Sequence, residues 1–149
     1  MLIPFDAAHR EAYLAMARDF YASDAVDHPI PPAQMERTYD QVLAGSPYVA
    51  GYLFSHQGQI AGYALLMKSW SQEAGGIVIW VDEIYVAPEA RGAGLGTAFF
   101  QALPSLFPEA AAFRLELEPD NQKARALYGR MGFSPLGYDQ MVRIVQNNP

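Results

Sequence analysis

The feature that most constrains the fold is an abrupt change of pattern near residue 86. Residues 77–86 are β-branched or aromatic over most of their length, which is typical of a strand buried on both faces. A stretch rich in Pro and Gly follows, and from Gly94 the apolar residues return at helical spacing until Pro108. The chain therefore contains a buried strand joined by a glycine loop to an amphipathic helix, which predicts an α/β or α+β fold.

The other segments alternate between the same two patterns. Apolar residues at a period of 3.6 predict helices over residues 9–21, between Pro31-Pro32 and Gly45, and between an N-cap at Asp120 or Asn121 and a stop at Gly132. Strand patterns cover residues 49–54 and 59–67, which flank a glycine-containing turn, then 113–117 and, as a strand or hairpin, 133–145. With a first strand at the N-terminus, the expected order is strand, two helices, three strands, helix, strand, helix, strand, around a mixed sheet.

Composition narrows the class of protein. The 149 residues suit one domain over 1–149, no apolar run is long enough to span a membrane, and the N-terminus lacks the pattern of a secretory signal, so we expect a cytoplasmic protein. The absence of cysteine excludes a cysteine nucleophile and Cys-ligated zinc, and no His–carboxylate spacing suggests a metal. The net charge of −6 argues against a nucleic-acid surface, which needs clustered Lys and Arg.

The junction between the buried strand and the helix is suited to binding a phosphate group. Glycines at positions 92, 94 and 96 free backbone N–H groups to face outward, and the helix N-terminus adds partial positive charge. Arg91 at the rim can add a charge-assisted contact. For a lone glycine-rich loop, a tight turn without any ligand is the simpler explanation.

Two familiar phosphate motifs do not fit this spacing. A P-loop needs Lys and then Ser or Thr after its last glycine, whereas Gly96 is followed by Thr97-Ala98. A dinucleotide fingerprint needs Gly or Ala where this chain has Thr97 or Phe99. Glu116 and Glu118 do lie near the acidic position that such a fingerprint expects, so dinucleotide binding is kept as the weaker alternative.

Two blocks of residues match one family in the right order. The first is R-x-x-G-x-G at Arg91, Gly94 and Gly96, preceded by Glu83-Ile84-Tyr85-Val86 and Pro88; the second is Asn121, Ala124, Leu127-Tyr128 and Met131-Gly132-Phe133. Together they resemble the GCN5-related N-acetyltransferase (GNAT) family closely over residues 77–133, and the expected element order extends the resemblance over the chain. The resemblance implies a three-layer fold, with about four helices flanking a mixed central sheet whose central strands splay apart.

The resemblance also implies acetyl-CoA as cosubstrate and an amine as acceptor, with direct transfer of the acetyl group. The pantetheine arm would insert between the splayed strands, and the N–H groups of residues 92–97 would hold the pyrophosphate. The N–H of Val86 would stabilise negative charge on the thioester oxygen. The implied cofactor-binding residues are Ile84, Val86, Arg91, Gly92, Ala93, Gly94, Leu95, Gly96, Thr97 and Asn121.

Three residues in or near the two matching blocks are candidates for proton transfer. Tyr128 resembles the family's tyrosine that protonates the departing thiolate, although it also lies on the apolar stripe of its helix, where a packing role stays open. The amine needs a base, and Glu83 and Asp82 are carboxylates in an otherwise apolar strand. Strand alternation puts them on opposite faces unless a bulge intervenes. We favour Glu83, because its place three residues before Val86 resembles the family's common acidic position.

The identity of the acceptor is not encoded in any motif. The resemblance places its determinants in residues 21–30, in residues 70–75 and after Phe133. Asp24, Asp27 and Glu73 there would favour a cationic amine, although ordinary solvent-exposed carboxylates explain them as well. His28 is an alternative base or substrate contact. The competing function is a non-catalytic domain that senses acetyl-CoA or binds a partner, and a homodimer is left open.

Overall fold

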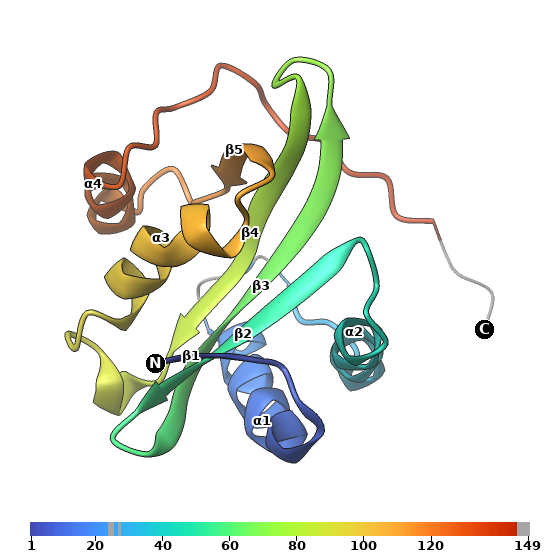
Figure 1. Ribbon diagram of the computed structural model, residues 1–149, viewed down its shortest axis with the longest axis vertical. Helices are drawn as coiled ribbons and strands as arrows, with labels where there is room; N and C mark the ends of the chain where they lie inside the picture. The colour runs from blue at the N-terminus through green and yellow to red at the C-terminus, as the bar shows by residue number, and fades with distance from the viewer. Residues whose placement is uncertain (24–25, 27, 146–149) are drawn as a thin grey trace.

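The fold is a single five-stranded sheet with helices on both faces (Figure 1). The structure is a computed structural model that describes residues 1–23, 26 and 28–145. The strands lie in the order of the chain, each antiparallel to the last except β5, which runs parallel to β4. Their bounds are β1 Leu2–Pro4, β2 Val49–His56, β3 Gln59–Ser71, β4 Gly76–Val86 and β5 Ala110–Leu115.

Two separate cores hold the helices to the sheet. On one face, α1 (Arg10–Tyr21) and α2 (Pro32–Leu43) bury an aromatic cluster that includes Tyr13, Tyr39 and Tyr63. On the other face, α3 (Leu95–Leu106) and α4 (Gln122–Arg130) pack around Phe99 and Phe100. Short 3₁₀ helices, η1 (Ala7–His9) and η2 (Pro88–Ala90), precede α1 and α3. The mixed sheet between helical layers confirms the predicted fold class.

Most of the predicted elements are confirmed, but the last one is wrong. After α4, residues 133–145 form neither helix nor strand and run on as an irregular trace (Figure 1). Pro135 and Gly137 interrupt the apolar pattern there, and both residue types are unfavourable inside strands. Phe133 still packs against the core, but the large apolar side chains from Leu136 onward are exposed, that of Met141 completely. A smaller difference concerns β5, which begins three residues earlier than the pattern at 113–117 indicates.

A β-bulge in β4 changes which face of the sheet each side chain occupies. Leu65 of β3 lies opposite Glu83 and Leu66 lies opposite Val81, so Asp82 is an extra residue without a partner. Before the bulge, Ile79 and Val81 pack into the core under α3. After it, Tyr85 packs into the core under α1. The bulge therefore turns Glu83 and Tyr85 toward α1, whereas a regular strand would turn them toward α3.

The sheet opens along the last third of β4. Pairing between β4 and β5 ends at Val81 and Leu115, whereas β4 continues to Val86 and stays paired with β3 as far as Gly62. The Ala87 N–H donates to the carbonyl of Ala61 in β3 at 2.9 Å. Because N–H groups alternate in direction along an antiparallel strand, the Val86 N–H points away from β3, toward the gap. This divergence confirms the expectation of splayed central strands.

Candidate active site

The glycine loop ends in an open helix N-terminus. Gly92 and Gly94 have left-handed backbone conformations, with φ of 83° and 77°, which glycine adopts at little cost. Gly94 is the N-cap of α3, and no side chain in the described part of the chain caps the helix there. The first internal hydrogen bond runs from the Ala98 N–H to the Gly94 carbonyl at 2.9 Å. The preceding N–H groups of Leu95, Gly96 and Thr97 thus lack acceptors within the helix, and the end is suited to an anion.

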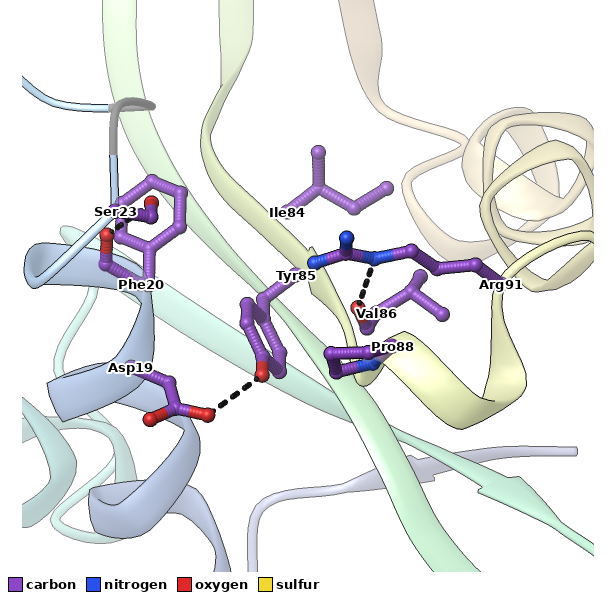
Figure 2. A pocket seen from close by; sticks show the side chains of 8 residues that line it. All are labelled: Asp19, Phe20, Ser23, Ile84, Tyr85, Val86, Pro88 and Arg91. Atoms are coloured by element: carbon purple, nitrogen blue, oxygen red, sulfur yellow. Dashed lines mark hydrogen bonds between the residues drawn. The ribbon is translucent and has the colours of Figure 1, made fainter.

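Arg91 joins this loop to the end of β4. Its Nε donates to the Val86 carbonyl at 3.1 Å, while its side chain is otherwise exposed (Figure 2). The bond also shows that the Val86 carbonyl faces away from β3, in agreement with the direction inferred for its N–H. The loop therefore presents one guanidinium group and a set of backbone N–H groups next to the open edge of β4.

Glu83 is a buried carboxylate with two hydrogen-bond donors. Its side chain is 7% exposed, and the hydroxyl groups of Tyr21 and Tyr63 each donate to one of its oxygens, that of Tyr63 at 2.7 Å. Burial raises the pKa of Glu83 above its ordinary value, because the charged form loses hydration; the two tyrosine bonds oppose this rise. A carboxylate in this setting takes up a proton more readily than an exposed one.

Asp82, the extra residue of the bulge, has different surroundings. Its side chain is open to solvent over part of its surface, yet enough protein surrounds the carboxyl group for desolvation to raise its pKa to about 6. The negative charges of Glu83 and Glu116 add to the rise. The described structure gives Asp82 no side-chain hydrogen-bond partner, so of the two candidate bases only Glu83 is held in place by hydrogen bonds.

Tyr128 lies on the opposite side of the sheet from Glu83. It is half-buried on α4, edge-to-face with Phe100 at a centroid distance of 5.2 Å and with Phe133 at 6.1 Å. Burial raises its pKa, so it keeps its proton at neutral pH. The packing role and the proton-donating role therefore fall on the same side chain.

A cavity of about 360 Å³ links α1 to the open end of β4 (Figure 2). It reaches both faces of the strand, because Ile84 and Val86 pack on the α3 side and Tyr85 packs on the α1 side. The Tyr85 hydroxyl donates to Oδ2 of Asp19 at 3.1 Å across the cavity wall. The lining residues are Asp19, Phe20, Ser23, Ile84, Tyr85, Val86, Pro88 and Arg91.

Several other residues that the sequence suggested for the site do not line this cavity. Asn121 caps α4, with its Oδ1 accepting from the Ala124 N–H at 3.0 Å. Glu73 lies in the turn before β4, 3.9 Å from the Arg114 guanidinium and at the opposite end of the strand from Val86. His28 is exposed. Asp24 and Asp27 fall outside the described residues.

Sequence reasoning missed Tyr21 and Tyr63, which donate to Glu83, and the bonded pair of Tyr85 and Asp19. The pattern marks Tyr63 and Tyr85 only as strand residues, and their faces depend on the bulge. Within the ranges that the structure describes, no group of three or more His, Cys, Asp or Glu side chains is arranged to hold a metal ion. Over the same ranges, no helix has the length and hydropathy needed to cross a membrane.

The hydrogen bond from Tyr63 gives a test of the site that does not depend on its function. The Tyr63→Phe substitution removes a donor that stabilises the carboxylate form of Glu83, so the pKa of Glu83 rises further. NMR titration of the Glu83 carboxyl carbon measures this change as a midpoint at higher pH. Tyr39→Phe is the matched control, because the Tyr39 hydroxyl donates to the Asp6 carbonyl instead. An unchanged midpoint in Tyr63→Phe contradicts the described network.

Known proteins match this chain in both sequence and fold. The sequence profile described as Acetyltransferase (GNAT) family matches residues 11–133. A putative [ribosomal protein bS18]-alanine N-acetyltransferase of Bacillus subtilis (strain 168) is 31% identical over 113 residues, which cover 71% of this chain and 67% of that protein. Streptothricin acetyltransferase of Streptomyces lavendulae is 35% identical over 85 residues, 55% of this chain. The match spans 42% of the length of the Streptomyces protein.

A solved structure supports the fold over nearly the whole chain. A possible acetyltransferase from Clostridium difficile 630 superposes with a TM-score of 0.82 at 13% identity, covering 99% of this chain and 98% of that one. The family match covers most of the chain and includes the glycine loop, the bulged strand and α4. This chain belongs to the Acetyltransferase (GNAT) family.

Proposed function

We propose that this chain is an acetyl-CoA-dependent N-acetyltransferase that acts on an amine of a small molecule, a peptide or a protein. The observation that carries the proposal is the open edge of β4 beside the uncapped N-terminus of α3. The names of both sequence relatives, which describe acetyltransferases, support the same reaction class. A cytoplasmic location, a single domain over residues 1–149 and a homodimer are further proposals that rest on the sequence alone.

The residues of the loop fit the phosphate groups of acetyl-CoA. A Cβ atom added at Gly92 or Gly94 would have no heavy atom within 4 Å, so the loop is open on that side. Backbone N–H groups and the Arg91 guanidinium lie at the same end of α3, where both would contact a bound anion. The apolar side chains of Ile84 and Val86 line the route from this loop along β4. The remaining proposed contacts are Ala93, Leu95, Gly96, Thr97 and Asn121.

Acetyl-CoA supplies the activated acetyl thioester. The Val86 N–H, which points into the gap beside β4, is placed to donate to an oxygen that gains negative charge there. Glu83 accepts a proton from the ammonium group of the acceptor, because only the neutral amine has an electron pair with which to attack. The carbon–nitrogen bond forms as the carbon–sulfur bond breaks, and Tyr128 donates a proton to the departing thiolate. The nitrogen loses its second proton, which restores the Tyr128 hydroxyl, so one proton is released overall through Glu83.

The cofactor site is best tested at Gly96. Substitutions at Gly92 or Gly94 strain a left-handed backbone, whereas a Cβ at Gly96 makes an ordinary 3.7 Å contact with Ile84. Gly96→Ala should leave the apoprotein as stable as before, because alanine is the better helix former. A methyl group facing the phosphates should raise the Kd for acetyl-CoA roughly tenfold, or about 1.4 kcal/mol. Thermal shift and calorimetric titration measure the two quantities.

Gly129→Ala is the matched control for this substitution. Gly129 also lies in a helix, with open space around it, and is not among the proposed cofactor contacts, so the affinity of this variant for acetyl-CoA should stay at the wild-type value. Acetyl-CoA should raise the melting temperature of the wild type by mass action, and NAD should do much less. A larger shift with NAD would favour the dinucleotide alternative.

Glu83→Gln tests the proposed base. The variant keeps the shape of the side chain but cannot take up the amine proton, so thiol release at neutral pH should fall by roughly 10²- to 10⁴-fold. The deficit should shrink as the pH rises, because the acceptor amine then deprotonates unaided. A pH–rate profile identical to that of the wild type would remove Glu83 from the mechanism. The same measurement on Asp82→Asn then decides whether the other carboxylate is the base.

Tyr128→Phe tests whether Tyr128 acts as the general acid or only packs in the core. The ring and its contacts with Phe100 and Phe133 remain, so only the hydroxyl is lost. If Tyr128 protonates the thiolate, kcat should fall by roughly 10²- to 10⁴-fold with little change in cofactor affinity. Tyr52→Phe is the control, since Tyr52 is a half-buried tyrosine that packs edge-to-face on Phe107 in the same core. Equal activity in both variants means that Tyr128 only packs.

A further inference from the structure

Two reciprocal hydrogen bonds tie α1 to β4 beside the cavity. Tyr21 of α1 donates to Glu83 of β4, and Tyr85 of β4 donates to Asp19 of α1. Each element thus contributes one tyrosine and one acid, two positions apart in the chain. Residues i and i+2 of a strand lie about 6.6 Å apart on the same face, so the two hydrogen bonds join α1 to β4 at positions separated by that distance. The structure therefore holds two carboxylates on the α1 side of β4, one buried and one exposed.

The proposed chemistry uses Glu83 but gives no role to Asp19. Asp19 lines the cavity with an exposed carboxylate, and only one of its oxygens, Oδ2, accepts the Tyr85 bond. A carboxylate has about four acceptor positions, so Asp19 retains capacity for a further donor. The Tyr85 bond fixes its position rather than neutralising its charge, since a hydroxyl group is uncharged.

The end of α1 adds to the negative potential at this point. Asp19 lies in the last turn of α1, which ends at Tyr21, and a helix C-terminus carries a partial negative charge. Arg18 is in the same turn, but neighbouring side chains project about 100° apart around a helix, and Arg18 is not among the cavity-lining residues that the structure describes. The remaining charge on the wall is Arg91, whose Nε is bonded to the Val86 carbonyl at the cofactor end.

We propose that Asp19 binds a second positive charge on the acceptor, so that the preferred substrates are small diamines rather than monoamines. This inference rests on the proposed N-acetyltransferase function. The distal ammonium group binds Asp19 at the cavity wall, and the methylene chain carries the reacting nitrogen along the cavity to the open edge of β4 beside Val86. Phe20, Ile84 and Tyr85 supply apolar wall for those methylenes, and the aromatic faces favour a cation.

A single substitution tests the assignment. In Asp19→Asn the side chain keeps an oxygen that accepts the Tyr85 hydroxyl but loses the charge. We expect the wild type to show higher kcat/KM for putrescine and cadaverine than for butylamine and pentylamine, beyond the statistical advantage of two equivalent amines. Asp19→Asn should lower kcat/KM for the diamines roughly 10- to 100-fold more than for the monoamines, the range for losing a hydrogen bond to a charged group.

Two further variants separate local recognition from general electrostatics and from misfolding. Glu109→Gln removes one negative charge at an exposed position before β5, so it should keep the wild-type preference for diamines. Asp19→Glu restores the charge one methylene further along, so it should keep a preference for diamines and shift it toward putrescine, the shorter of the two. Binding of acetyl-CoA, followed by thermal shift, should be at the wild-type level in all three variants.

The outcomes distinguish this inference from the function on which it rests. Turnover of monoamines and diamines at equal efficiency by the wild type overturns the role of Asp19 alone. The same conclusion follows if Asp19→Asn retains the preference, or if Glu109→Gln loses it to the same extent. Absence of thiol release with these four amines overturns this inference, whereas absence with amino acids, aminoglycosides and peptides as well, despite binding of acetyl-CoA, overturns the enzymatic function and favours the non-catalytic alternative.

Discussion

The extra residue in β4 is the constraint on which the site depends. A regular strand would place Glu83 on the same face as Ile79 and Val81, among the apolar side chains under α3. Burial there without hydrogen-bond donors would be costly for a carboxylate. The bulge at Asp82 instead brings Glu83 to the α1 face, where Tyr21 and Tyr63 meet it. One inserted residue therefore decides both the hydrogen bonding of the acid and the side of the sheet on which an acceptor would meet it.

The same bulge gives two consecutive carboxylates, Asp82 and Glu83, different surroundings. Glu83 is buried and bonded through both oxygens, so desolvation and hydrogen bonding act on its pKa in opposite directions. Asp82 has no such donors in the described structure, and desolvation together with the neighbouring charges of Glu83 and Glu116 acts on it in one direction only. Because a base needs both a suitable pKa and a fixed position, the hydrogen bonds favour Glu83. Desolvation alone would not distinguish the two residues.

The sequence predicted those parts of the molecule that depend on local pattern. Helical periodicity identified α1 to α4, and the spacing of Arg91, Gly94 and Gly96 indicated the open N-terminus of α3. The bulge was not predictable, because it depends on the register between β3 and β4 rather than on any residue in either strand. The contact between Tyr21 and Glu83 joins positions 62 residues apart, and helical spacing alone does not show which strand residue a helix meets. The error at residues 133–145 arose from counting apolar residues across Pro135 and Gly137.

The pair of tyrosines at Glu83 also gives the site a route for the proton after each turnover. A hydroxyl group both donates and accepts, so a protonated Glu83 can donate to the oxygen of Tyr21 once the Tyr21 hydrogen, which points at Glu83, turns toward another acceptor. Tyr21 is half-buried at the end of α1, whereas Tyr63 is completely enclosed, so only the first leads toward solvent. In the proposed enzyme, a relay through Tyr21 would therefore return Glu83 to its carboxylate form after each turnover.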